Sequence, residues 1–210
     1  MKSLIAEHLL NIQAVSLSPD QPYTWSSGML SPIYCDNRIT LGFPKVRNAI
    51  VEGFVNIIKQ SYPEADVIAG TATAGIPHAA LIADKLQLPM CYVRGEAKAH
   101  GKGKQIEGLA EKGSKAVVIE DLISTGKSSL QAAKALEEKG VEVLGIAAIF
   151  TYELAAADIK FAEQNIRVQT LTDFSTLVEE ALKLGSIDNG ELKLLQSWKR
   201  DPQGWLAAPR

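Results

Sequence analysis

The chain has 210 residues, 46% of them hydrophobic and 22% charged, and its formal net charge is −2. This length suits one domain with a sizeable core, and the small net charge gives no overall sign of a nucleic-acid or membrane partner. No apolar run approaches the roughly 18 residues of a membrane-spanning helix, and residues 1–15 are typical of an amphipathic helix rather than a signal peptide. We therefore expect a cytoplasmic protein.

The two cysteines give no indication of a metal site. Cys35 and Cys91 lie among apolar or aromatic neighbours, without a CxxC motif or a His/Cys spacing. We interpret both as reduced, partly buried thiols.

The apolar pattern predicts an α/β fold. Residues 4–12 have helical spacing, and residues 16–44 then contain many turn-forming prolines and glycines. The elements expected next are a helix over 44–58, a strand over 66–70, a helix over 76–87, strands over 89–94 and 115–122, a helix over 127–139, a strand over 141–150, a helix over 153–164, a strand over 167–173, and helices near 174–184 and 188–199. Short strands that alternate with helices indicate a central parallel sheet flanked by helices on both faces.

We expect a single domain, 1–210, in three parts. An N-terminal helix and turn-rich region (1–43) precedes a core (44–173), and C-terminal helices (174–210) follow. In such sheets ligands bind beyond the carboxyl ends of the strands. The loops after the strands should therefore carry the chemistry.

The strongest motif is VVIEDLISTGKSS, residues 117–129. Its strand ends in Glu120 and Asp121, and buried carboxylates are costly unless they meet hydroxyls, a metal or cations. Next, Gly126 permits a tight turn, and the first N–H groups of a helix can receive an anion. A nucleotide P-loop is excluded, because that motif needs glycine where Asp121 stands. The motif predicts a phosphate held beside two acids.

Two further loops follow strand ends. Residues 71–77, TATAGIP, form a small-residue loop whose backbone amides can approach a ligand closely. Residues 94–108, RGEAKAHGKGKQIEG, are basic, rich in glycine and poor in apolar residues. This composition, directly after a strand, indicates a mobile lid over an anion.

Residues 117–129 resemble the donor-binding signature of type I phosphoribosyltransferases. The resemblance implies that family's fold and a 5-phosphoribosyl 1-diphosphate donor, with Mg²⁺ held mainly through the donor. Glu120 and Asp121 then face the ribose hydroxyls, the loop 124–128 holds the 5′-phosphate, and the loop 71–74 resembles the pyrophosphate loop. The residues assigned to the donor in this way are Thr71, Ala72, Thr73, Ala74, Arg94, Lys98, His100, Glu120, Asp121, Leu122, Ile123, Ser124, Thr125, Gly126, Lys127 and Ser128.

The basic segment resembles the flexible loop of orotate phosphoribosyltransferases, which has an arginine, a lysine four positions later and a histidine two beyond. Arg94, Lys98 and His100 match these positions, although relatives often have lysine where this chain has Gly95. The resemblance implies that Lys98 and His100 are catalytic together with Asp121. It also implies a homodimer in which the 94–108 loop reaches the neighbouring subunit's site.

Residues 22–38, PYTWSSGMLSPIYCDNR, resemble the base-binding hood of the same enzymes. Some relatives have lysine in place of Ser26 and an arginine after the fourth strand, where this chain reads FTYEL. Backbone amides then take a larger share of the orotate contacts. The residues assigned to orotate by resemblance are Ser27, Gly28, Tyr34 and Ser124.

The resemblance implies transfer of the phosphoribosyl group to orotate, which gives orotidine 5′-monophosphate and diphosphate in pyrimidine biosynthesis. Two alternatives remain. One is a phosphoribosyltransferase for another base, against which the basic segment and the hood argue. The other is a non-catalytic, donor-binding regulator of the same fold, which usually adds a DNA-binding module and a basic face.

Overall fold

The computed structural model describes residues 1–25, 27–95 and 105–205. The helices are α1 (Lys2–Asn11), α2 (Pro44–Ser61), α3 (Gly75–Leu86), α4 (Lys127–Glu138), α5 (Ala155–Glu163), α6 (Phe174–Lys183) and α7 (Asn189–Arg200), with a 3-10 helix η1 (Asn37–Gly42). The strands are β1 (Val15–Leu17), β2 (Tyr23–Thr24), β3 (Leu30–Ser31), β4 (Ile33–Cys35), β5 (Val67–Thr71), β6 (Met90–Val93), β7 (Ile106–Gly108), β8 (Lys115–Ile123), β9 (Glu142–Thr151) and β10 (Val168–Asp173). Each element expected from residue 44 onwards is present, with ends that differ by a few residues at most.

Six strands form the central sheet in the order β10-β9-β8-β5-β6-β7. The pairs among β10, β9, β8, β5 and β6 are all parallel, which confirms the expected α/β class. The edge strand β7 instead pairs antiparallel with β6. Its three residues lie inside the basic segment, where the glycine-rich composition gave no strand signal.

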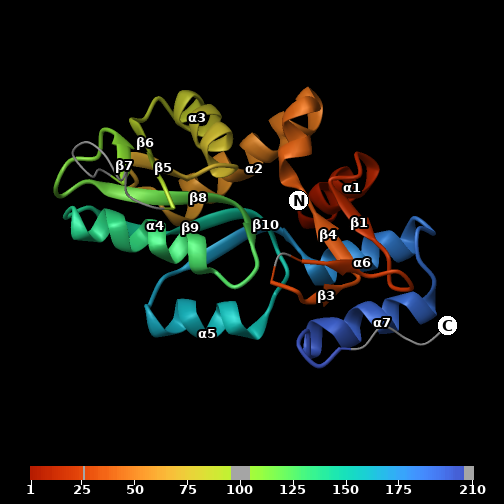
Figure 1. The fold of residues 1–210 in the computed structure, drawn as a ribbon. Helices are drawn as coiled ribbons and strands as arrows, with labels where there is room; N and C mark the ends of the chain where they lie inside the picture. The colour runs from red at the N-terminus through yellow and green to blue at the C-terminus, as the bar shows by residue number, and fades with distance from the viewer. Residues whose placement is uncertain (26, 96–104, 206–210) are drawn as a thin grey trace.

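The sheet separates two apolar layers, because side chains alternate between the faces of a strand. In β8, Val117 and Ile119 belong to the buried cluster that includes residues of α1, α2 and α3. Ala116 and Val118 belong to the cluster that includes residues of α4 and α5. Figure 1 accordingly shows α2 and α3 on one side of the sheet and α4 and α5 on the other.

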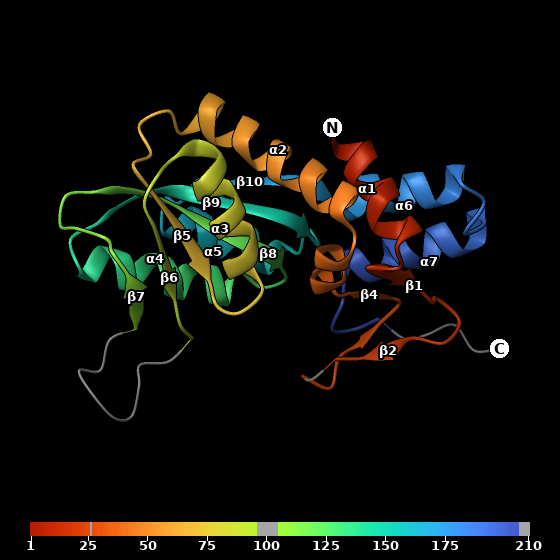
Figure 2. The same ribbon diagram turned by 90° about the horizontal axis from the view of Figure 1, so that it is seen from above.

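The two ends of the chain pack together beside the core. α1 contacts α6, and α6 contacts α7, so N-terminal and C-terminal segments lie side by side (Figures 1 and 2). Residues 16–44, expected as turns, contain two short antiparallel pairs, β1 with β4 and β2 with β3. We keep the name hood for residues 22–38, which include the β2–β3 hairpin.

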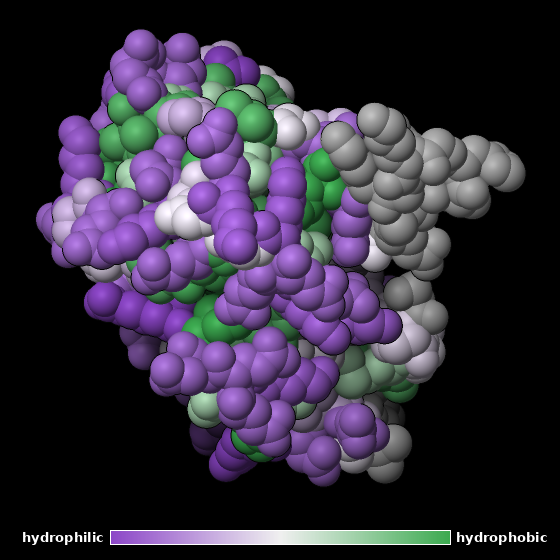
Figure 3. Space-filling view, turned by 90° about the vertical axis from the view of Figure 1, so that its left-hand side faces the viewer, coloured by the Kyte–Doolittle hydropathy of each residue, from purple (hydrophilic) through white to green (hydrophobic). Residues whose placement is uncertain are grey.

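The surface at the β7 edge of the molecule is mostly hydrophilic (Figure 3). Hydrophobic residues appear there only in patches between polar ones. Among the described residues, no helix is both long and apolar enough to cross a membrane.

Candidate active site

The acid pair lies where β8 ends in the middle of the sheet. Glu120 is only 4% exposed, and its two carboxyl oxygens accept hydrogen bonds from the Ser128 hydroxyl (2.7 Å) and the Asp121 N–H (3.1 Å). Burial raises the pKa of Glu120 from 4.5 to about 8, against the lowering effect of the Ser128 hydrogen bond. Burial also raises the pKa of Asp121. The pair therefore retains a proton near neutral pH until ligand groups compensate its charge.

The predicted phosphate loop follows directly and begins α4. A cavity of about 390 Å³ opens on it, lined by Leu122, Ser124, Thr125, Gly126, Lys127, Ser128 and Gln131. Gly126 has a left-handed backbone (φ +72°) that reverses the chain into the helix. The sequence thus places small hydroxyl side chains and the N-terminus of α4 around one hollow, which suits a phosphate dianion.

The second loop lies between β5 and α3, beside the acid pair. Gly75 approaches the Ile119 carbonyl of β8 so closely that a side chain has no room. Thr71 is buried, and its hydroxyl has no hydrogen-bond partner among the described residues. The loop therefore brings backbone and one unpaired hydroxyl next to β8. Its assignment to the pyrophosphate stays a prediction.

The basic segment is described only at its base. The Arg94 N–H donates to the Gln105 carbonyl (2.9 Å), and the Arg94 guanidinium lies 3.7 Å from the Glu107 carboxylate. Lys98 and His100 lie outside the described residues, so their assignment stays a prediction.

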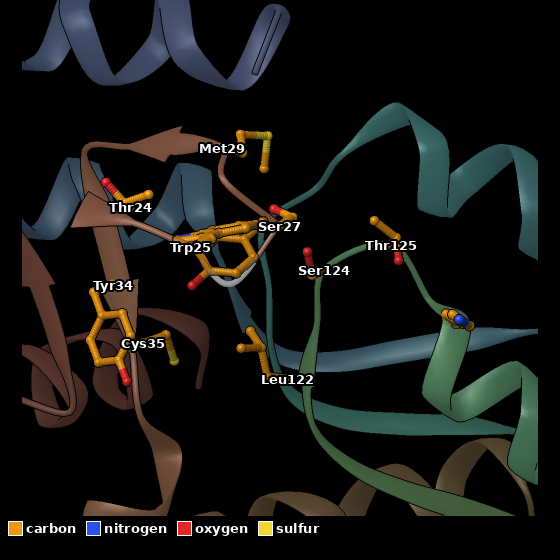
Figure 4. A pocket seen from close by; sticks show the side chains of 11 residues that line it. Thr24, Trp25, Ser27, Met29, Tyr34, Cys35, Leu122, Ser124 and Thr125 are labelled. Carbon is orange, nitrogen blue, oxygen red and sulfur yellow. The ribbon is translucent and has the colours of Figure 1, made fainter. Parts of the chain in front are cut away.

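The larger cavity, of about 780 Å³, lies between the hood and the phosphate loop. Figure 4 shows Trp25 near the middle of the view, with Tyr34 and Cys35 to one side and Ser124 and Thr125 to the other. The lining residues are Thr24, Trp25, Ser27, Met29, Tyr34, Cys35, Leu122, Ser124, Thr125, Lys127 and Tyr152. Leu122, Ser124, Thr125 and Lys127 also line the phosphate cavity, so the two hollows adjoin. The arrangement suits a planar apolar-faced ligand next to a phosphate-bearing one.

Three of the four residues predicted for the base, Ser27, Tyr34 and Ser124, line this cavity. Gly28 lies in the turn of the β2–β3 hairpin with φ +83°, and its N–H donates to the Trp25 carbonyl at 2.8 Å. That amide is therefore engaged within the hairpin in this conformation. Its role toward orotate stays a prediction.

Tyr152 and Asn37 are among the residues of the site that were not predicted from the sequence. Tyr152 lies just beyond the carboxyl end of β9, where ligands bind in such sheets. Nothing in the sequence distinguished it from an aromatic residue of the core. Asn37 is 1% exposed and donates its side-chain N–H to the Asp121 carbonyl at 2.7 Å, which ties η1 to the acid pair. A contact between residues so distant in the chain leaves no periodic signal.

His78 is buried in α3, where burial and the nearby Arg47 lower its pKa to about 4. His78 is therefore neutral at physiological pH.

The fold and the site together define a phosphoribosyltransferase. The family model of the phosphoribosyl transferase domain matches residues 45–173, which include both phosphate loops and the acid pair. The chain is 59% identical to the orotate phosphoribosyltransferase of Bacillus subtilis (strain 168) over 203 residues, 97% of this chain and 94% of the relative. It belongs to the orotate phosphoribosyltransferase family.

Solved structures agree with this assignment. The crystal structure of orotate phosphoribosyltransferase from Aeropyrum pernix is similar with a TM-score of 0.76 and 29% identity, covering 88% of this chain and 99% of that one. The structure of Leishmania donovani UMP synthase is similar with a TM-score of 0.81 and 25% identity. That match covers 95% of this chain, which spans 42% of the longer protein.

Proposed function

We propose that the chain transfers the 5-phosphoribosyl group of 5-phosphoribosyl 1-diphosphate to orotate, giving orotidine 5′-monophosphate and diphosphate in pyrimidine biosynthesis. The observation that carries the proposal is the adjoining pair of cavities, one aromatic and one lined by the hydroxyls of the phosphate loop. A base and a sugar phosphate bound there meet at Leu122 and Ser124, beside the acid pair.

The chain contributes position and charge rather than a nucleophile. As diphosphate departs, positive charge develops on the ribose, and carboxylates at its hydroxyls stabilise that charge. Asp121 and Glu120 take this role, while the loop 124–128 holds the 5′-phosphate. The hood and the basic segment exclude water that would hydrolyse the sugar cation.

Mg²⁺ fits this site as an ion carried by the donor. The described residues contain no group of three or more His, Cys, Asp or Glu side chains that could hold a metal ion by themselves. The loop 71–74 contains Ala74 and the unpaired Thr71 hydroxyl but no lysine or arginine. When bound, Mg²⁺ neutralises the leaving diphosphate.

Lys98, His100 and Arg94 close over the leaving group, and Lys98 and His100 act from the neighbouring subunit of a cytoplasmic homodimer. The base of the segment supports this placement. The Arg94 N–H bond to the Gln105 carbonyl joins the two ends of the segment, so it begins and ends at the outer edge of the central sheet.

Purified protein should consume orotate only when both donor and Mg²⁺ are present, as followed by the loss of orotate absorbance. Chelation should abolish turnover, and added Mg²⁺ should restore it, because the diphosphate's charge is otherwise uncompensated. Adenine, guanine, hypoxanthine and uracil serve as controls. Faster turnover of one of these bases, or donor binding without any turnover, would contradict the proposed function.

The phosphate loop offers a second test through Gly126→Ala. A methyl group at Gly126 would meet the Phe161 ring at 2.6 Å in a backbone that already has positive φ. Gly113→Ala is the matched control, because Gly113 has φ +89° but open space around it. We expect both variants to lose about 1–2 kcal/mol of unfolding free energy from backbone strain, and Gly126→Ala to lose more. Only Gly126→Ala should raise the KM for the donor, by about tenfold. Equal donor KM values in the two variants would mean that the loop 124–128 does not bind the 5′-phosphate.

A further inference from the structure

Trp198 of α7 is fully buried where three parts of the chain meet. Its indole N–H donates a hydrogen bond to the Leu30 carbonyl of β3, at 3.1 Å. Its ring stands edge-on to Trp25 of the hood and to Tyr152 after β9, with 5.8 Å between ring centres in each case. One C-terminal side chain thus contacts both the hood and the end of the central sheet.

Trp198 does not line the larger cavity, but Trp25 and Tyr152 do. Their ring centres lie 4.9 Å apart, so they form a continuous aromatic wall. The Tyr152 N–H also donates to the Ile123 carbonyl, which fixes that wall against the end of β8. The edge-on indole of Trp198 lies against both rings and limits their movement, because close-packed aromatic side chains have few alternative arrangements.

α7 also fixes the loop after β9, which contains Tyr152 and Glu153, through its next residue, Lys199. The Lys199 ammonium lies 2.7 Å from the Glu153 carboxylate and 2.8 Å from the Ser175 hydroxyl. Glu153 has positive φ (+54°), a conformation that is uncommon outside glycine. The ion pair and the Ser175 N–H bond to the same carboxylate oxygen hold the loop in that conformation. Two consecutive residues of α7 therefore fix two consecutive residues of the cavity loop.

α7 lies outside residues 45–173, which the family domain model matches. We propose that Trp198 is a positioning residue for the acceptor base. It holds Trp25 and Tyr152 at the spacing that receives the base, and so sets the affinity for the acceptor without touching it. This inference rests on the proposed function, because it takes the larger cavity as the acceptor site.

Trp198→Phe tests the proposal, since it keeps an aromatic ring but leaves the Leu30 carbonyl without its donor. We expect the KM for orotate to rise about tenfold, while kcat and the KM for the donor stay within about twofold. Trp205→Phe is the matched control. Trp205 is also buried near the C-terminus, but its indole N–H bonds Ser197 of α7 instead of the hood. It should leave both KM values unchanged.

Donor binding in the absence of any base, measured by titration calorimetry with Mg²⁺, separates acceptor effects from general damage. An unchanged KM for orotate, or equal rises in both KM values, overturns the proposal. If Trp198→Phe does not fold, Lys199→Met carries the same expectation through the Glu153 loop, and the same results decide. If the wild-type chain uses another base instead of orotate, the proposed function is wrong. The KM values of the same variants, measured with that base, then test whether Trp198 positions the acceptor.

Discussion

Replacing Lys98 with alanine should lower kcat about a thousandfold while donor affinity falls only severalfold. Negative charge on the leaving diphosphate grows as its bond to the ribose breaks, so a cation placed there stabilises the transition state more than the bound donor. Steady-state kinetics give kcat, and titration calorimetry with donor and Mg²⁺ gives the affinity. Lys112→Ala, at an exposed lysine in the turn after β7, is the matched control and should leave both unchanged. Wild-type turnover in Lys98→Ala would disprove the lid assignment.

The same variant tests the homodimer. If the basic segment acts in the neighbouring site, a heterodimer of Lys98→Ala with Asp121→Asn has one intact site out of two. Random mixing of the two inactive variants should then restore about a quarter of wild-type activity. A segment that acts within its own subunit predicts no recovery, because every site then carries one of the two changes.

Most of the core could be predicted from the sequence because it depends on local patterns. β8 is rich in valine and isoleucine. Gly140, with φ +83°, follows the end of α4 and marks where that helix stops. Both signals lie within a few residues of the structure that they determine. The edge strand β7 and the β2–β3 hairpin of the hood were not predicted, because strands of two or three residues are too short to show alternation.

The sequence also singled out the proposed donor site, since Glu120, Asp121 and the loop 124–128 are consecutive in the chain. The acceptor half was singled out only in part, because Ser27, Tyr34 and Ser124 line the larger cavity but its aromatic wall was not predicted. Its wall combines Trp25 with Tyr152, and the support comes from Trp198, so three distant segments meet through ring contacts alone. Side-chain packing across such separations follows from the whole fold and has no short-range spacing.

The buried acid pair makes stability depend on pH, and Glu120→Gln should remove most of that dependence. The folded chain holds a proton on Glu120 up to about pH 8, whereas the unfolded chain releases it above its ordinary pKa of 4.5. Between these values the folded state binds more protons, so the unfolding free energy falls as pH rises. The stabilising contribution is complete below pH 4.5 and is lost by about pH 8. Over this window the loss is on the order of a few kcal/mol, because each pKa unit corresponds to about 1.4 kcal/mol.

A glutamine at this position imitates the protonated acid. Its carbonyl can accept from the Asp121 N–H, and its amide can donate to the Ser128 hydroxyl, so both existing contacts keep a partner. Without substrates, Glu120→Gln should therefore match the wild-type melting temperature near pH 5 and exceed it near pH 8.5. Glu137→Gln, an exposed carboxylate on α4, is the control and should follow the wild-type curve. Parallel curves for wild type and Glu120→Gln would mean that the acid is ionised in the folded chain. In that case Glu120 is already ionised before the donor binds. The affinity for the donor should then not rise between pH 4.5 and about pH 8.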